Sequence, residues 1–198
     1  MKRYDKEYFD RWYRRPGTRV ITPADVRRKA QLAVGAAEYL LQREVRSVLD
    51  VGCGEGAWQP VLKKLRPKAR YSGVDPSEYA VRRFGARRNI RLGAFGELDE
   101  AGLEGPYDLV VCVGVVNYLE TRELRAGLQA IAAMCGGIAL IEAFAKEDEI
   151  EGDTVQWKWR PAREWRRHFA EAGLVACGLH LYVPPAMQWN TVALERLN

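Results

Sequence analysis

The chain has 198 residues, of which 47% are hydrophobic, enough for one sizeable core, so we expect a single domain over residues 1–198. The net charge of +5 is carried by arginines dispersed among acids, without a run of five like charges, which argues against a nucleic-acid partner. No apolar run reaches eighteen residues and the charged, aromatic start does not resemble a signal peptide, so the composition argues against membrane insertion and secretion.

The predicted elements alternate between helices and strands. Two helices come first, at 5–14 and 23–43, the second opened by Thr22 as a cap and Pro23 at the first helical position. Apolar strands and amphipathic helices then follow one another, with strands at 47–51, 71–74, 90–95, 108–115 and 138–144, and helices at 58–66, 77–86 and 121–135. Nearly continuous apolar strands separated by helices predict a parallel sheet covered on both faces.

The C-terminal part departs from this alternation. An irregular polar stretch at 145–160 follows the fifth strand, and a helix at 161–172 ends at Gly173. Two β runs, 174–183 and 189–197, have no helix between them and are expected to pair antiparallel. The predicted fold is a Rossmann-like, doubly wound, seven-stranded and mostly parallel sheet with an antiparallel last strand, in which 1–43 form an N-terminal helical lid and 45–197 the core.

The four cysteines, at positions 53, 112, 135 and 177, are far apart and form no CxxC pair. Two of them lie within apolar strand-like runs, which favours buried, reduced thiols. We therefore expect a cytoplasmic protein without a metal site.

The most informative stretch is SVLDVGCGEGAWQ, in which three glycines at alternate positions follow an apolar strand. In a doubly wound sheet the first turn from strand to helix usually binds the ligand, and glycine allows the ligand to approach the backbone closely. A tight turn that needs glycine only for its geometry is the simpler alternative. Three glycines in five residues favour a ligand loop.

Two ligand classes fit this loop, because Gly52, Gly54 and Ala57 also satisfy a permissive dinucleotide pattern. A diphosphate requires donors and no carboxylate, whereas Asp50 and Glu55 place two acids here, which favours a cation. S-adenosylmethionine carries an ammonium and a sulfonium. Asp75, at the end of the next strand, lies where a carboxylate would hold ribose hydroxyls.

Three segments then resemble motifs of class I S-adenosylmethionine-dependent methyltransferases of the small-molecule type. LDVGCGEG resembles the first motif, GVDPSEYAVRRF the second and PYDLVVCVGVVNYL the fourth, within a resemblance that covers roughly 45–195. The resemblance implies S-adenosylmethionine as cofactor, S-adenosylhomocysteine as product, and cofactor contacts by Asp50, Gly52, Gly54, Glu55, Asp75, Pro76, Ala94, Phe95 and Val113. It also implies that an N-terminal helix covers the cofactor, which makes Tyr8 and Tyr13 further cofactor contacts.

Few residues qualify for acid–base chemistry. Tyr118 follows the fourth motif and is a candidate to orient an acceptor, although a packed aromatic explains it equally well. His180 alternates with apolar residues, so an ordinary strand position is the favoured explanation beside a catalytic role. His168 shares a helical face with Trp165 and Phe169, which favours a packed residue.

Four residues are candidates for acceptor binding: Asn117, Trp157, Trp159 and Arg160. Together with N-terminal aromatics, Trp157 and Trp159 are expected to form a roof over the carboxyl ends of the strands. Arginines in the two segments suggest an anionic acceptor, although dispersed arginines are more often a solvated face.

The sequence therefore predicts methyl transfer from S-adenosylmethionine to a small molecule. A nucleotide-binding oxidoreductase is disfavoured by the two acids of the loop. A methyltransferase acting on tRNA, rRNA or protein and a non-catalytic domain that binds S-adenosylmethionine both stay open.

Overall fold

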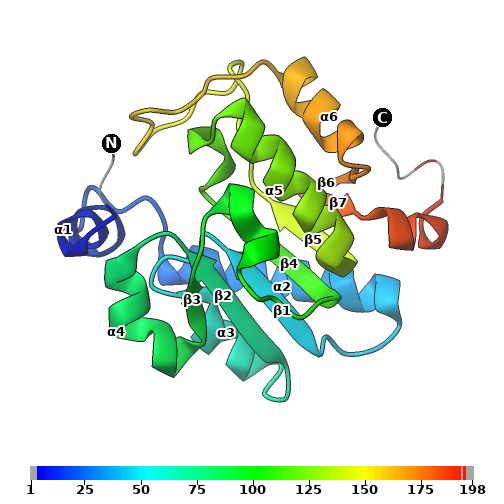
Figure 1. Ribbon diagram of the computed structural model, residues 1–198, viewed down its shortest axis with the longest axis horizontal. Helices are drawn as coiled ribbons and strands as arrows, with labels where there is room; N and C mark the ends of the chain where they lie inside the picture. The colour runs from blue at the N-terminus through cyan, green and yellow to red at the C-terminus, as the bar shows by residue number, and fades with distance from the viewer. Residues whose placement is uncertain (1–3, 193, 195–198) are drawn as a thin grey trace.

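The computed structural model describes residues 4–192 and residue 194. A seven-stranded sheet with the order β3-β2-β1-β4-β5-β7-β6 forms its centre (Figure 1). The strands are β1 (Ser47–Val51), β2 (Arg70–Asp75), β3 (Ile90–Leu92), β4 (Tyr107–Cys112), β5 (Cys135–Ile141), β6 (Val175–Gly178) and β7 (Leu181–Val183). Strands β1 to β5 pair in parallel, and β7 pairs antiparallel with both β5 and β6. The predicted doubly wound sheet with an antiparallel last strand is confirmed.

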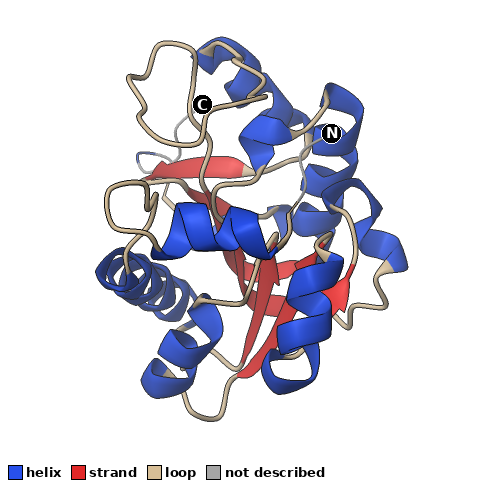
Figure 2. Ribbon diagram, turned by 90° about the vertical axis from the view of Figure 1, so that its left-hand side faces the viewer, coloured by secondary structure: helices blue, strands red, loops and turns tan. Residues whose placement is uncertain are grey.

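Helices lie on both sides of this sheet (Figure 2). The α-helices are α1 (Lys6–Phe9), α2 (Pro23–Leu41), α3 (Trp58–Leu65), α4 (Glu78–Arg88), α5 (Thr121–Met134) and α6 (Ala162–Glu171). A π-helical turn, η1 (Asp10–Arg14), continues α1, and the 3₁₀ segments are η2 (Phe95–Glu100), η3 (Val116–Tyr118) and η4 (Pro185–Asn190). One core cluster joins α2 and α3 to the sheet, and a second joins η2, α5 and α6 to its other face.

Local sequence explains the start of α2. The Thr22 side chain accepts from the backbone N–H of Asp25 while the Asp25 side chain accepts from the backbone N–H of Thr22, and Pro23 occupies the first turn. This reciprocal arrangement satisfies amides that have no partner inside the helix. The apolar face of α2 then packs on the sheet through small residues such as Ala30 and Ala33, both fully buried.

The C-terminal prediction was wrong in detail. A strand hairpin, β6 and β7, replaces the single predicted run at 174–183, because Leu179 and His180 adopt φ values of +53° and +59° and reverse the chain. The described residues of the predicted strand at 189–197 do not form it: 189 and 190 belong to η4, which begins at Pro185 directly after Pro184, and proline cannot donate to a strand ladder. Part of that predicted run, residue 193 and residues 195–198, lies outside the described residues.

Two segments lie at the end of the sheet where the parallel strands finish. The N-terminal segment, defined as residues 4–22, places α1 beside α4 (Figure 1). The second segment, residues 145–160, is irregular as predicted and runs from β5 toward α6. Both contribute to the lining of one cavity at the ends of β1, β4 and β5, which makes them its covers. Within the described part of the chain, no helix has the length and apolarity needed to span a membrane.

Candidate cofactor and acceptor site

The loop after β1 depends on its glycines. Gly52 and Gly54 have φ values of +68° and +54°, a region that strongly favours glycine. A Cβ atom on Gly52 would lie 2.3 Å from the side chain of Val115, and one on Gly54 would lie 2.9 Å from the ring of Phe9. The loop therefore needs glycine both for its conformation and for the close approach of two neighbouring segments.

A cavity of about 550 Å³ lies over this loop. Its volume falls within the ~300–1,000 Å³ typical of small-molecule sites. It brings together predicted site residues from four separate parts of the sequence: Tyr8, Tyr13, Asp50, Gly52, Gly54, Glu55, Val113, Tyr118 and Trp157.

Asp50 is the buried acid beneath the cavity. It lies near the end of β1, is 3% exposed, and accepts a hydrogen bond of 2.7 Å from the hydroxyl of Tyr71. Burial, with a smaller contribution from the charge of Asp75, raises its pKa to about 7 against the opposing effect of the Tyr71 hydrogen bond. A carboxylate that has lost its hydration in this way is stabilised by an incoming cation.

Asp75, at the end of β2, is also buried, but it does not belong to the cavity lining. One carboxylate oxygen accepts from the amide of Gly54 at 2.6 Å and the other from the amide of Ser77 at 2.9 Å. Burial raises the pKa of Asp75, and these two amides oppose the rise. Each oxygen still has capacity for a second hydrogen bond. The neighbouring Pro76 is exposed.

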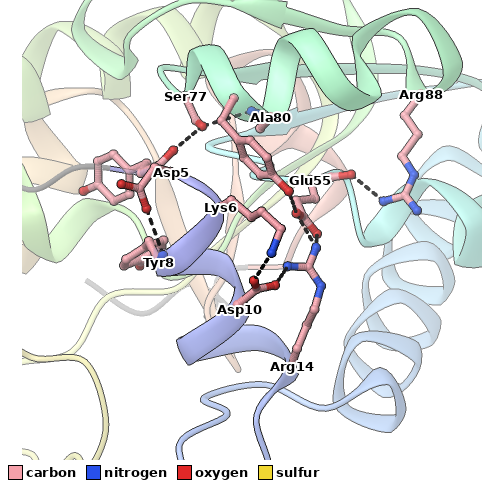
Figure 3. Close-up of polar contacts among 11 residues, drawn as sticks. Asp5, Lys6, Tyr8, Asp10, Arg14, Glu55, Ser77, Ala80 and Arg88 are labelled. Carbon is pink, nitrogen blue, oxygen red and sulfur yellow. Dashed lines mark hydrogen bonds and ion pairs between the residues drawn. The ribbon is translucent and has the colours of Figure 1, made fainter.

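Glu55 forms an ion pair, and this corrects the argument from the sequence that both acids of the loop favour a cation. The guanidinium of Arg14 donates to both of its carboxylate oxygens at 2.5 Å, and the Tyr79 hydroxyl donates at 3.2 Å (Figure 3). Arg14 also donates to Asp10 in the same π-helical turn. Glu55 therefore ties the N-terminal segment to the loop, and Asp50 is the acid that gives the cavity floor its preference for a cation.

Further contacts fix the N-terminal segment over the loop. The ring of Phe9 is 3% exposed and stacks on Tyr79 of α4 with centroids 5.8 Å apart. The Ser77 hydroxyl donates to the backbone carbonyl of Tyr4 at 2.5 Å. Burial and then the charge of Asp75 raise the pKa of Tyr4, and likewise of Tyr13, to about 12. The segment therefore lies close to Asp75 and accounts for its low exposure.

Asp153 joins three parts of the site. Its side chain accepts from the hydroxyl of Tyr8 at 3.1 Å, and its backbone carbonyl accepts from the hydroxyl of Tyr118 at 2.5 Å. Burial raises the pKa of both phenols well above the ordinary value. These two tyrosines are thereby held as hydrogen-bond donors that connect both covers to the end of β4.

The structure places Ala94 and Phe95 away from the cavity. Ala94 precedes η2, and the Phe95 ring is buried against α5, where a Cβ on Gly127 would lie 2.1 Å from it. Phe95 therefore fills a notch that the missing side chain of Gly127 leaves in α5. Its ring packs in the core, and neither Phe95 nor Ala94 belongs to the cavity lining.

Asn117 and Arg160 hold the 145–160 segment in position. The Asn117 amide donates to the Phe144 carbonyl at 2.7 Å and accepts from the Phe144 amide at 3.0 Å. The Arg160 guanidinium, 5% exposed, donates to the carbonyl of Leu119 at 2.7 Å and lies over the ring of Trp165. Neither side chain belongs to the cavity lining.

Trp157 provides an aromatic wall of the cavity. Its ring is nearly parallel to that of Phe144, at 7° with centroids 5.8 Å apart, and meets Tyr118 edge to face at 6.0 Å. Trp159 contacts Trp157 but is 42% exposed and lies outside the lining.

The histidines lie elsewhere. His180 occupies the turn between β6 and β7, and its ring contacts Phe144 edge to face. His168 is buried in α6 beside Glu164 and Glu171, as the helical pattern predicted. Neither belongs to the cavity lining.

Several charged residues of the cavity were not predicted, and two of them form an ion pair. Lys29 of α2 and Glu142, directly after β5, both line it and form an ion pair with 2.5 Å between Nζ and Oε1. Lys29 and Glu142 are 113 residues apart, so no local pattern in the sequence connects them. Helical periodicity indicates only that Lys29 is a polar position. The order of the elements was the one available signal, because it places the end of β5 beside the end of β4.

The donor set fits S-adenosylmethionine better than a diphosphate. Asp50 offers a desolvated carboxylate for an ammonium, and Asp75 offers two oxygens for a diol. The glycine loop leaves no room for side chains at its closest contacts. A diphosphate at the same place would be repelled by Asp50.

Comparison with known proteins agrees with this assignment. Residues 24–177 match the family described as a methyltransferase domain. An uncharacterized protein of Synechococcus is 32% identical over 113 residues, covering 52% of this chain and 27% of its own length. Malonyl-[acyl-carrier protein] O-methyltransferase of Bacillus cereus is 28% identical over 104 residues, covering 50% and 38%. The chain thus spans less than half the length of these curated relatives.

Solved structures share the fold. CalS10 of Micromonospora echinaspora, an amino pentose methyltransferase solved with bound S-adenosylmethionine, superposes with a TM-score of 0.62 at 19% identity, covering 79% of this chain and 89% of its own. DesVI of Streptomyces venezuelae gives 0.63 at 19%, covering 82% and 91%. The family match covers most of the chain, and the fold and the donor set agree with it. The chain therefore belongs to the methyltransferase domain family and has the Rossmann-like fold of these solved structures.

Proposed function

We propose that this methyltransferase transfers a methyl group to a small molecule enclosed in the cavity beneath its two covers. The observation that carries the proposal is the bridge through Asp153, which joins Tyr8 of the N-terminal segment to Tyr118 at the end of β4. With the covers joined, the acceptor reaches the strand ends only by entering the cavity. A cavity of about 550 Å³ under joined covers favours a small molecule over a folded polymer surface.

In this proposal the cofactor half of the site lies over the ends of β1 and β2. Asp50 pairs with the ammonium, Asp75 holds the ribose hydroxyls, and the backbone at Gly52 and Gly54 follows the methionine part. When bound, S-adenosylmethionine supplies an electrophilic methyl group. Val113 lies beside the reacting position, and the covers exclude water and align the acceptor, which is sufficient for a large part of the acceleration of an in-line displacement.

The names of structural neighbours support a small acceptor without fixing its chemistry. CalS10 is named for an amino pentose, and another neighbour, from Synechocystis, for magnesium protoporphyrin IX. Two of the arginines that suggested an anionic acceptor have other partners: Arg14, which lines the cavity, pairs with Glu55, and Arg160 is buried outside the lining. We therefore propose a single domain, residues 1–198, that acts in the cytoplasm on a small acceptor without an obligatory negative charge.

The test has two steps. Calorimetric titration should show micromolar binding of S-adenosylmethionine and S-adenosylhomocysteine, about −8 kcal/mol, and no competition by NAD. Methyl-labelled S-adenosylmethionine is then added to a cell extract that has been separated into small molecules, RNA and protein. Label transferred to the small-molecule fraction supports the proposal. Label in RNA or protein shows a polymer substrate, and binding without transfer to any fraction shows a non-catalytic module.

A further inference from the structure

The carboxylates that line the cavity have different surroundings, and these surroundings decide which of them is available to an acceptor. Asp50 is buried against Tyr71 on the floor, and both carboxylate oxygens of Glu55 accept from Nη2 of Arg14. Asp153 accepts from Tyr8, and Glu151 is an exposed residue of the 145–160 segment. Glu142 is the remaining carboxylate of the described lining.

Glu142 lies where the acceptor end of the cavity begins. Its backbone amide donates to the carbonyl of Cys112, the last residue of β4, at 2.9 Å, so it marks the adjacent ends of β4 and β5. Its side chain is 14% exposed, and Lys29 engages Oε1. Oε2 accepts no hydrogen bond from the described residues and stays available to a ligand.

We infer that Glu142 accepts the proton of the acceptor's nucleophile, and that this nucleophile is an acidic hydroxyl, phenolic or enolic, on a flat molecule. This inference rests on the proposed function and adds the acceptor class to it. Lys29 is a positioning residue, since its ammonium fixes the orientation of the carboxylate.

The surroundings of Glu142 select this chemistry. The Lys29 ammonium, 2.5 Å from Glu142, repels a second cation, so a protonated amine is disfavoured beside it. A carboxylate accepts a proton from a phenol more readily than from an alcohol, because proton transfer is most efficient between groups of closer pKa. Phe144 and Trp157, whose rings lie nearly parallel, line the same cavity as Glu142, and aromatic faces of this kind suit a planar molecule.

The step balances without another reactant. The acceptor oxygen bonds to the methyl carbon as the bond from that carbon to sulfur breaks, and the electron pair stays on sulfur. The hydroxyl proton passes to Oε2 of Glu142. The products are a methyl ether, a neutral thioether and a protonated carboxyl group, and the proton leaves to solvent when the covers open.

The turnover test uses 2-naphthol as the flat phenol, with 2-naphthylmethylamine and 2-naphthoate as matched cationic and anionic probes. We expect labelled methyl transfer to 2-naphthol and to neither of the others. Glu142→Gln should lower kcat by ~10²–10⁴-fold, the range of general acid–base catalysis, with the dissociation constant of S-adenosylmethionine within twofold. The control is Glu120→Gln, which alters an ion pair of equal 2.5 Å length, with Lys158, outside the cavity and should keep its rate.

A second acceptor distinguishes proton transfer from mere packing. 4-Nitrophenol ionises in mildly alkaline buffer and then needs no base, so Glu142→Gln should lose far less activity with it than with 2-naphthol. Lys29→Met should follow the same pattern more weakly, and Lys29→Arg should restore the rate with 2-naphthol. Equal losses for both phenols would overturn the role of Glu142.

A binding measurement gives a readout that does not depend on turnover. In the complex with S-adenosylhomocysteine, the carboxylate of Glu142 should raise the pKa of bound 4-nitrophenol and bleach its yellow phenolate band. In the Glu142→Gln variant, bound 4-nitrophenol should keep more of its yellow phenolate band. No binding of either phenol, or transfer to the amine in preference, refutes the acceptor class, whereas failure to bind S-adenosylmethionine refutes the proposed function itself.

Discussion

Two acids lie near the ends of neighbouring strands of the same sheet, but the chain segments around them differ. Asp50 at β1 and Asp75 at β2 are both buried, at 3% and 6% exposure. Asp50 nevertheless borders an open cavity, while Asp75 lies under the N-terminal segment, with its carboxylate bonded to the amides of Gly54 and Ser77. Both acids are buried near the ends of parallel strands. The segment that packs over the sheet therefore decides which of the two acids a ligand reaches first.

The different surroundings of Asp50 and Asp75 imply an order of events when the cofactor binds. A ligand can approach Asp50 in the structure as it stands, whereas the contacts made by Tyr4, Phe9 and Arg14 cover the region around Asp75. If Asp75 holds the ribose as proposed, the N-terminal segment moves before the cofactor is fully seated. Four predictions test this difference between the two acids.

The largest effect is expected for Asp75→Ala. Loss of two charge-assisted hydrogen bonds to the ribose, each ~1.5–3 kcal/mol before non-additivity, should weaken S-adenosylmethionine binding at least tenfold. Calorimetry measures the affinity. A thermal melt checks the fold, because the variant also frees the amides of Gly54 and Ser77. Unchanged affinity in a folded variant would remove Asp75 from the site.

Asp50→Asn should stabilise the ligand-free protein at neutral pH. Burial raises the pKa of Asp50 to about 7, so the folded state binds more protons than the unfolded chain between about pH 4 and pH 7, and stability falls as pH rises through this window. The amide carries no charge and still accepts from Tyr71. We expect a gain of about 1–3 kcal/mol at pH 7.5 in urea unfolding and little gain near pH 4. A loss of stability at pH 7.5 would contradict the assigned charge.

The same carboxylate should make cofactor binding pH-dependent. Below pH 7 the ligand's ammonium replaces a proton on Asp50, so affinity should rise by up to about tenfold per pH unit and level off above the pKa of about 7. Asp50→Asn should bind more weakly and show a flat profile over the same range. A wild-type profile that is flat from pH 5.5 to pH 7 would show that no proton is displaced from Asp50.

The smallest effect is expected for Arg14→Ala. Its exposed ion pair with Glu55 contributes about 1 kcal/mol to holding the N-terminal segment down, so its loss should speed S-adenosylmethionine association about fivefold in stopped-flow fluorescence. Arg11→Ala is the control, because Arg11 stacks on Trp12 within the same turn. A slower association would mean that Arg14 helps to bind the cofactor.

Local sequence patterns were sufficient to predict most of the fold. Strand β1 has the bounds that its apolar run predicted, Ser47–Val51, and α2 begins at Pro23 behind its Thr22 cap. These features depend on a few adjacent residues. The hairpin of β6 and β7 was not predicted because two non-glycine residues, Leu179 and His180, adopt left-handed conformations that the sequence does not signal.

The site was predicted less completely, because its charges pair over long distances in the chain. Arg14 and Glu55 are 41 residues apart, and only the fold shows that Glu55 is neutralised. Phe95 was expected by position to contact the cofactor, whereas the space beside Gly127 of α5 takes up its ring in the core. Sequence patterns identify the acids at strand ends, but their partners depend on packing.

The bridge at Asp153 has a kinetic consequence. Since Tyr8 and Tyr118 both donate to this residue, neither cover opens without disturbing the other. In the proposed function, methylated product and spent cofactor therefore leave after one shared opening step, and we expect a single slow step after the chemistry. A burst of product in the first turnover would reveal that step, and Asp153→Ala, which loses the bond from Tyr8, should shorten it.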